Sequence, residues 1–367
     1  MVSPGCTKCY AMLLALARLE HVFRNAYKKA GFSDWQTRPV WGDKATRVKT
    51  KGFWKDALRW NTSAAGAAVR PRVFPSMIDW LDECPAGMID QDGTKLDPIE
   101  VLAELLKLIH DTPNLDWLLL TKRPEKFDDR MGGVANVFGQ RSSAKWDTKM
   151  LNWVQAWRRG DAIPTNIWIG ASVEDQRRAD ERIPHLLKIP AKVRFLSVEP
   201  MLGPINFPLA APCGYYCECD SPGVDWPEGH RPGHGLSGIH WMIFGGESGP
   251  GARPCNLDWI GDGVRQCRAA GVKVFVKQLG AVVVTENANM FDWPDDVRLI
   301  AGKPDDPGFA FAYIKTKDSK GGDPAEWPED LRIREFPEVA SLTEGGSISE
   351  AFSSGTSGAG SRASAPQ

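Results

Sequence analysis

The sequence predicts an α/β protein in which residues 1–280 form a parallel (β/α) barrel, TIM-like but partial. Short apolar runs alternate about five times with helix-like segments, as strands and crossover helices do in a parallel sheet. The runs are hydrophobic throughout rather than at every second residue, which is typical of strands buried on both faces. No GxGxxG phosphate loop follows the first strand, so a barrel is favoured over an open nucleotide-binding sheet.

The strands are expected at apolar runs bounded by turn residues or polar residues: 72–77, 115–121, 166–171, 193–198, 239–245 and 272–277. Helices are expected between them, at 98–110, 148–158, 174–187 and 257–270. In the third of these helices, apolar residues recur at helical spacing: Ala179, Ile183, Leu186 and Leu187.

Three regions depart from this alternation. Residues 211–238 are an insertion between two strands, rich in Cys, Gly, Pro and His. Residues 281–340 contain many Asp and Pro residues, and we expect them to form a small C-terminal cap. Residues 341–367 are rich in Ser, Gly and Ala with almost no large apolar side chains, which predicts a disordered tail.

The net charge and the distribution of apolar residues limit the classes of protein to which the chain can belong. The chain has 367 residues and a net charge of −1, which argues against a strong general attraction for nucleic acid but leaves room for a local basic groove. No apolar stretch of about 18 residues and no signal-peptide pattern occurs, so we expect no membrane span and a cytoplasmic location. In that reducing compartment, closely spaced cysteines indicate metal binding more than disulfides.

Polar residues follow the predicted strands. In a parallel barrel the carboxyl ends of the strands meet at one rim, where chemistry gathers. Five strand ends supply such residues here: Thr121-Lys122-Arg123, Ser172 with Glu174-Asp175, Ser197 with Glu199, Glu247-Ser248, and Lys277-Gln278. The alternative is that loops are polar for solubility alone. Five such ends on one rim nevertheless predict a cavity of mixed charge.

One strand end is rich in glycine. Gly245 and Gly246 precede Glu247 and Ser248, and glycines at a strand end let a ligand approach the backbone, whose successive amides can hold an anion. A tight turn is the plainer interpretation of the same residues.

The first cysteine motif is C-x-x-C. Cys6 and Cys9 place two thiols close together at a turn that runs into a helix, an arrangement that lowers thiol pKa and suits metal or cluster ligation. The motif alone does not decide between a redox dithiol, half of a zinc site, part of an iron–sulfur site, and coincidence.

The insertion carries a second group of potential ligands. Cys213, Cys217 and Cys219 are followed by His230 and His234, and zinc prefers four Cys or His ligands in a tetrahedron. The spacing is not that of a standard zinc finger, so free thiols in an irregular loop are the alternative. Cys84, Cys255 and Cys267 are solitary in the sequence.

The chain resembles a phage-encoded family of unknown function, which itself resembles radical S-adenosylmethionine (SAM) enzymes. The resemblance spans roughly residues 1–337 and is carried by an ordered set of stretches: VSPGCTKCYA (2–11), LLLTKRPEKF (118–127), NIWIGASVEDQRRADERIPHL (166–186), VRFLSVEPMLGPI (193–205), HWMIFGGESGPGARP (240–254), VFVKQLG (274–280) and GGDPAEWPEDLRIREFP (321–337).

The resemblance implies a cofactor site. Family members have a third cysteine upstream of the VSPGC element, and the three-cysteine motif resembles the one that holds a [4Fe–4S] cluster with SAM on its open iron. The sequence begins at Met1, directly before this element, so the outer cysteine and the first strand are missing from it. We expect them to lie upstream of the assigned start; the alternative is that this protein has lost the site.

Three functional hypotheses follow. In the first, the chain is a radical SAM enzyme acting on an unknown substrate, conceivably a nucleotide or nucleic acid, with a partner protein encoded nearby. Cys6 and Cys9 would then bind iron. The cofactor or substrate cavity would be lined by Glu199, Gly245, Gly246, Glu247, Ser248 and Lys277. The second is a phage accessory protein, binding or nuclease-like, with a zinc site at Cys213, Cys217, Cys219 and His230. The third is thiol–disulfide exchange through Cys6 and Cys9.

Overall fold

The structure is a computed structural model that describes residues 18–75, 78–141, 145–207, 236–249, 251–286, 294, 298–301 and 312–338. The chain divides into two compact units, residues 1–337 and residues 338–367, and the first contains every described residue except Glu338.

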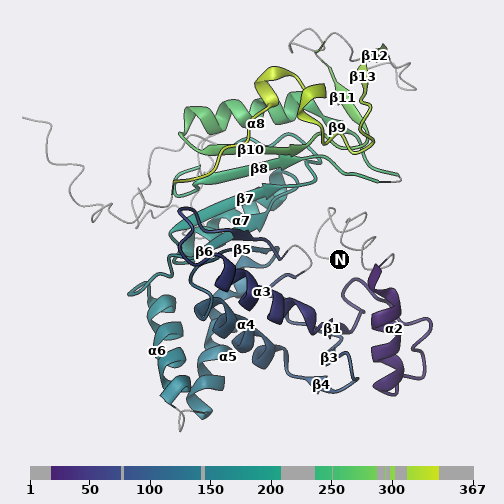
Figure 1. Cartoon of the computed structure of the whole chain (residues 1–367). Coiled ribbons are helices and arrows are strands. Elements are labelled where there is room, and N and C mark those ends of the chain that lie inside the picture. Colours follow the sequence, from purple (N-terminus) through teal and green to yellow (C-terminus); the bar gives the residue numbers. More distant parts are fainter. Residues whose placement is uncertain are drawn as a thin grey trace, which may run out of the picture. The chain divides into compact units, whose positions relative to one another are not determined.

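The main sheet has six parallel strands in the order β10-β8-β7-β6-β5-β2, which follows the chain from one edge to the other. They are β2 (Arg72–Val73), β5 (Asp116–Thr121), β6 (Ile167–Ser172), β7 (Val193–Val198), β8 (Trp241–Gly245) and β10 (Lys273–Gln278). The sheet is curled, as in half of a barrel (Figure 1). The predicted mixed α/β architecture with a partial parallel barrel is confirmed at this level.

The strand expected at 72–77 is much shorter than predicted. The ladder of β2 ends at Val73, and Pro75 follows closely with no backbone N–H to donate to a neighbouring strand. The other five strands lie within two residues of the predicted runs.

The crossover helices begin at clear caps. Asp97 accepts a hydrogen bond from the Ile99 amide at 2.7 Å and starts α4 (Pro98–His110). Asp175 starts α7 (Gln176–Lys188), and Asn256 starts α8 (Leu257–Ala269), each by accepting from an amide of the first turn.

One crossover contains a helix that the sequence did not predict. Between β5 and β6 lie a short 3₁₀ turn (Pro124–Lys126), α5 (Phe127–Gln140) and α6 (Lys145–Arg159). Gly132 and Gly133 lower the helix propensity of α5, which hides it in the sequence. In the structure a Cβ on Gly133 would lie 2.9 Å from the side chain of Ile99, so glycine lets α5 pack closely on α4.

Two smaller sheets flank this core in the chain. The first contains β1 (Arg47–Lys49), β3 (Met88–Asp90) and β4 (Lys95–Leu96), and it is accompanied by α2 (Glu20–Lys29) and α3 (Gly52–Ser63). The second contains β9 (Cys255–Asn256), β11 (Val283–Thr285), β12 (Arg298–Ala301) and β13 (Ala312–Lys315). Two further 3₁₀ turns span Pro324–Glu326 and Glu329–Leu331.

The two faces of the main sheet differ in their side chains. The face that packs with the helices is aliphatic at most positions, for example Ile167 and Ile169 on β6. The opposite, inner face carries aromatic rings towards the amino ends of the strands. Trp241 there contacts Trp168 at 5.8 Å, Phe195 at 5.7 Å and Phe275 at 5.9 Å between ring centroids.

A C-terminal segment completes this aromatic region. Residues 333–337 run antiparallel along β10, with the Val276 amide donating to the Ile333 carbonyl at 2.9 Å and the Glu335 amide to the Val274 carbonyl at 2.8 Å. The ring of Phe336 lies 5.1 Å from that of Trp241 and 3.9 Å from the guanidinium carbon of Arg72. Because Arg72 belongs to the opposite edge strand, Phe336 bridges both edges of the curled sheet.

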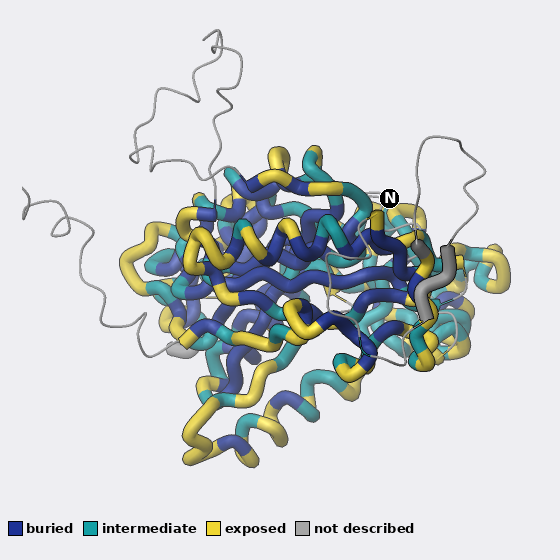
Figure 2. Tube along the Cα trace, turned by 90° about the horizontal axis from the view of Figure 1, so that it is seen from above, coloured by how far each residue is buried: buried dark blue, intermediate teal, exposed yellow. Residues whose placement is uncertain are grey.

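The buried residues follow the strands of the main sheet. Figure 2 shows buried residues running along the central strands and exposed residues gathered on the outer turns and helices. Among the described helices, none is long and apolar enough to span a membrane.

Gly170→Ala tests the packing of the inner face. A Cβ at this position would lie 2.3 Å from the ring of Phe195, so we expect the substitution to lower the free energy of unfolding by about 1–3 kcal/mol. The measurement is urea denaturation followed by circular dichroism. Gly139→Ala on α5, where nothing lies within 4 Å, is the control and should instead stabilise slightly. Equal midpoints for the two variants would contradict the packing.

Candidate functional site

The candidate site is the edge formed by the carboxyl ends of β5, β6, β7, β8 and β10. Parallel pairing brings these ends together, and the polar residues predicted from the sequence follow them. Of the predicted cofactor-binding residues, Glu199, Gly245, Gly246, Glu247, Ser248 and Lys277 are all within this edge. Cys6, Cys9, Cys213, Cys217, Cys219 and His230 lie outside the described residues.

Glu199 and Lys277 form an ion pair across the sheet. Glu199 follows β7, and its Oε1 lies 3.2 Å from the Nζ of Lys277 on β10, although β8 runs between these strands. The carboxylate passes over Gly245 of β8, where a Cβ would come within 2.7 Å of Glu199 Oε1. Ser197 donates to the other oxygen of Glu199 at 3.3 Å. Glycine at position 245 is therefore what allows this pair to form.

A bulge in β10 accompanies the pair. The register of β10 on β8 shifts between Val276 and Gln278, so Lys277 is the extra residue. Bulges bend a strand and re-aim a side chain, and they are frequent next to active sites. The Lys277 side chain is 43% exposed and that of Glu199 is 14% exposed, so the pair lies at a solvent-accessible edge rather than in the core.

Glu174 is the most buried carboxylate of the site. It is fully buried after β6 and binds two cations, the ammonium of Lys122 from the end of β5 and the guanidinium of Arg182 from α7 at 3.0 Å. Arg182 also donates to the backbone carbonyl of Ser172 at 2.5 Å. The ion pairs compensate the cost of removing these charges from water and fix the ends of β5 and β6 relative to α7.

Glu247 is held by one arginine. Its two carboxylate oxygens bind the guanidinium of Arg253, and one of them also accepts from the Arg253 amide at 2.9 Å. The hydrogen bonds that Arg253 donates to Glu247, with the charges of Glu247 and Glu174, raise the pKa of Arg253 above its ordinary value although burial lowers it. Ser248 follows, half-buried.

The Gly246 amide is engaged with the backbone of β10. It donates to the Gln278 carbonyl at 3.0 Å, and the Gln278 side chain donates to the Gly246 carbonyl at 2.9 Å. A Cβ at position 246 would lie 2.2 Å from the Leu279 carbonyl oxygen. This glycine therefore serves close backbone packing between β8 and β10.

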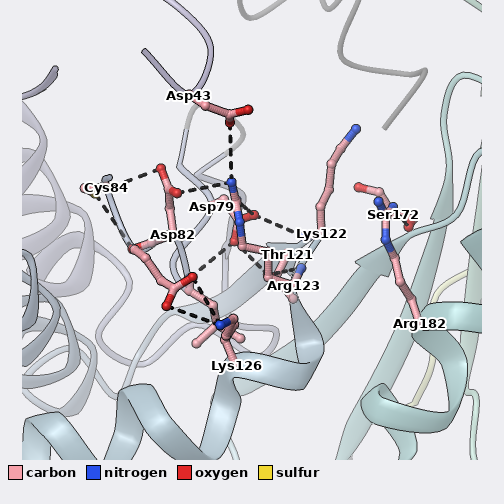
Figure 3. Close-up of polar contacts among 12 residues, drawn as sticks. Asp43, Asp79, Asp82, Cys84, Thr121, Lys122, Arg123, Lys126, Ser172 and Arg182 are labelled. Atoms are coloured by element: carbon pink, nitrogen blue, oxygen red, sulfur yellow. Dashed lines mark hydrogen bonds and ion pairs between the residues drawn. The ribbon is translucent and has the colours of Figure 1, made fainter. Parts of the chain in front are cut away.

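A further acidic network lies beside β5, and the sequence analysis missed it. Asp79, which follows β2, accepts from Thr121 Oγ1 at 2.6 Å, from the Lys122 amide at 3.1 Å and from the Arg123 guanidinium at 2.8 Å. Figure 3 shows Arg123 among three carboxylates, those of Asp43, Asp79 and Asp82. Burial lowers the pKa of Arg123, but these carboxylates outweigh it and raise the pKa. The signal was present, since Asp79 also follows a predicted strand.

Cys84 lies within this network. Its thiol is 3.7 Å from the Asp82 carbonyl oxygen, and the residue has a φ of +51°, in the left-handed region. Burial and the nearby Asp82 carboxylate raise the pKa of the thiol to about 11. The thiol of Cys84 is therefore protonated near neutral pH in the folded chain.

The site as a whole offers paired charges of both signs around small side chains. Acidic residues that could bind cations and basic residues that could bind anions alternate along the edge, and Ser172 and Ser197 are buried between them. No group of three or more metal-binding side chains occurs in the described part of the chain. The paired charges of the edge suit a polar ligand that carries both charges.

Comparisons with known proteins identify a family. The family model described as "Protein of unknown function (DUF5131)" matches residues 1–322. No curated protein and no solved structure matches the chain.

Arg182→Met tests the role of the buried ion pair. The substitution leaves Glu174 without its α7 partner at a fully buried position, and we expect a loss of about 3–5 kcal/mol in the free energy of unfolding. Chemical denaturation provides the measurement. Arg177→Met, on the exposed face of the same helix, is the matched control and should change stability little. A neutral effect of Arg182→Met would show that Glu174 is solvated.

Alkylation tests the environment of Cys84. With a pKa of about 11 instead of the usual 9.0, the folded thiol carries about a hundredfold less thiolate near neutral pH, so it should react that much more slowly with iodoacetamide. The rate should rise about tenfold per pH unit until the pH approaches the thiol pKa. Mass spectrometry of the Cys84 peptide, with denatured protein as reference, measures both. Equal rates in folded and denatured protein at neutral pH would refute the assignment.

Proposed function

We propose an enzymatic role for this chain, which belongs to the DUF5131 family of proteins of unknown function: it binds S-adenosylmethionine at the carboxyl edge of its half barrel and uses it, with an iron–sulfur cluster, for radical chemistry. The observation that carries the proposal is the Glu199–Lys277 pair, held over Gly245 at the edge where barrel enzymes place their chemistry. Phage origin and kinship with radical SAM enzymes, suggested by the sequence motifs, are part of the same proposal.

The chemistry of the pair fits the methionine part of SAM. That part is a zwitterion, with an ammonium and a carboxylate on the same carbon. Glu199 supplies an acceptor for the ammonium, and Lys277 supplies a cation for the carboxylate. In the structure the two side chains pair at 3.2 Å, so the ammonium and the carboxylate of SAM would exchange one ion pair for two, and the sulfonium would keep its own positive charge.

The cluster would be held through the CxxC motif. Cys6 and Cys9 would supply two thiolates, and the resemblance to radical SAM enzymes implies a third from upstream. When bound, a reduced cluster supplies the electron that cleaves SAM to a carbon-centred radical. The part of the chain that the structure describes does not include this motif, so the proposal rests on the sequence here.

The residues that the structure describes would bind and orient the SAM molecule and shield it. Ser197 holds the carboxylate of Glu199 towards Lys277, and Arg253 fixes the loop that carries Glu247. Aromatic rings line the opposite end of the inner face, which favours entry of a ligand from the carboxyl edge. Three points stay predictions: a nucleotide or nucleic acid as the substrate, a partner protein encoded nearby, and a cytoplasmic location.

The test combines metal analysis with SAM binding. A version of the chain extended upstream to include the third cysteine is purified anaerobically, reconstituted with iron and sulfide, and analysed for iron, sulfide and zinc. SAM binding is then measured by equilibrium dialysis. We expect a brown protein that contains iron and sulfide and binds SAM. Loss of a charged hydrogen bond in Glu199→Gln should weaken binding at least about tenfold.

Controls separate the outcomes. Glu181→Gln removes an exposed carboxylate from α7 and should leave SAM binding unchanged. Zinc without iron would overturn the radical proposal and favour an accessory protein with zinc at Cys213, Cys217, Cys219 and His230. Iron binding without any affinity for SAM would remove the role proposed for Glu199 and Lys277.

A further inference from the structure

Two arginines lie against aromatic rings where the C-terminal segment bridges the two edge strands of the half barrel, β2 and β10. The guanidinium carbon of Arg72 lies 3.9 Å from the ring centroid of Phe336, and that of Arg334 lies 5.1 Å from the ring centroid of Phe275. The two rings contact each other at 5.4 Å. These four residues form a continuous arginine–aromatic cluster. It includes neither side chain of the Glu199–Lys277 pair, and one Arg334 nitrogen (Nη2) donates to the backbone carbonyl of Lys277 at 3.3 Å.

The cluster is accessible and positively charged. Arg72 and Arg334 are exposed, and Phe275 and Phe336 are half-buried. Lys273, exposed at the start of β10, adds a third cation. The nearest acidic groups are engaged elsewhere: Asp116 pairs with Arg70 at 3.1 Å, and Glu335 accepts from the Val274 amide at 3.0 Å.

The donors of Arg72 have no acceptor in the described part of the chain. Its guanidinium makes no hydrogen bond or ion pair there and contacts only the rings of Phe336 and Trp168, the second at 5.2 Å. Burial lowers the pKa of Arg72, and the charge of Asp116 only partly opposes this. The indole N–H of Trp168, fully buried beside it, also lacks an acceptor among the described residues. A structural staple between the sheet edges would require the stacking but not this set of free donors.

We propose that the arginine–aromatic cluster binds single-stranded nucleic acid, with Arg72 and Arg334 contacting phosphates. A guanidinium stacked on a ring keeps its in-plane N–H donors free for phosphate oxygens. Flat guanidinium and aromatic surfaces are also the ones on which unpaired bases stack. The net charge of the whole chain is −1, so such binding would depend on this local group of cations rather than on general attraction.

The inference is independent of the proposed chemistry, because it uses none of the carboxyl-edge residues and needs no iron or SAM. The probe is a fluorescently labelled oligothymidylate, and its binding to the full chain is followed by anisotropy at several salt concentrations. We expect binding that weakens as salt rises. Arg72→Gln and Arg334→Gln should each weaken it about tenfold and reduce the slope of log affinity against log salt by about 0.7.

Two comparison variants and a folding check make the test decisive. Arg59→Gln removes an exposed arginine of α3 that pairs with Asp56, and it should change neither affinity nor slope. Arg72→Lys should keep the salt slope but lose affinity, because lysine retains the charge without the planar stack. Circular dichroism confirms that each variant is folded.

Absence of oligothymidylate binding would overturn the inference, and so would equal binding by Arg72→Gln and Arg59→Gln. Equal affinity for heparin and for the oligonucleotide would also overturn it, since a general polyanion surface needs no stacking. If the chain fails to bind SAM but binds the oligothymidylate as expected, the nucleic-acid surface is supported and the SAM proposal is not.

Discussion

Parallel pairing of the six strands is the constraint on which the rest of the structure depends. It brings every carboxyl end to one edge, and it sets the register in which side chains of different strands meet. Glu199 reaches Lys277 only because β8 lies between their strands with Gly245 at the crossing point. A slip of one residue in β8 would place Phe244 there and close the path.

The buried charges at this edge are better explained by geometry than by stability. Glu174 and Glu247 each lose their hydration, and a buried ion pair contributes little net stability compared with apolar side chains of the same volume. What the pairs do provide is a fixed position. Arg182 ties the end of β6 to α7, and the Glu247–Arg253 pair ties together the two ends of the loop between β8 and β9. Rigid, compensated charges around small residues are what a site for a polar ligand requires.

The strands of the main sheet could be predicted because continuous apolar runs report burial on both faces, and the polar edge followed from the parallel topology alone. Elements stabilised by tertiary contacts could not. Helix α5 contains Gly132 and Gly133, and the role of Gly133 is visible only in the close approach of Ile99 on α4. The sheet of β1, β3 and β4 has strands of two or three residues, too short for any periodicity. The roles of Arg182 and Arg253 could not be predicted, because nothing in their local sequence indicates the carboxylates that they contact.

The two ends of the half barrel differ in side-chain volume, and this difference determines where a ligand can enter. Towards the amino ends the inner face carries Trp168, Phe195 and Trp241, and Phe336 from the C-terminal segment packs against them. Towards the carboxyl ends the same strands carry Gly170, Ser172, Ser197 and Gly245. Among the described residues, large rings therefore line one end of the inner face, and small residues with paired charges line the other. The arginines at the aromatic end remain available for contacts outside it.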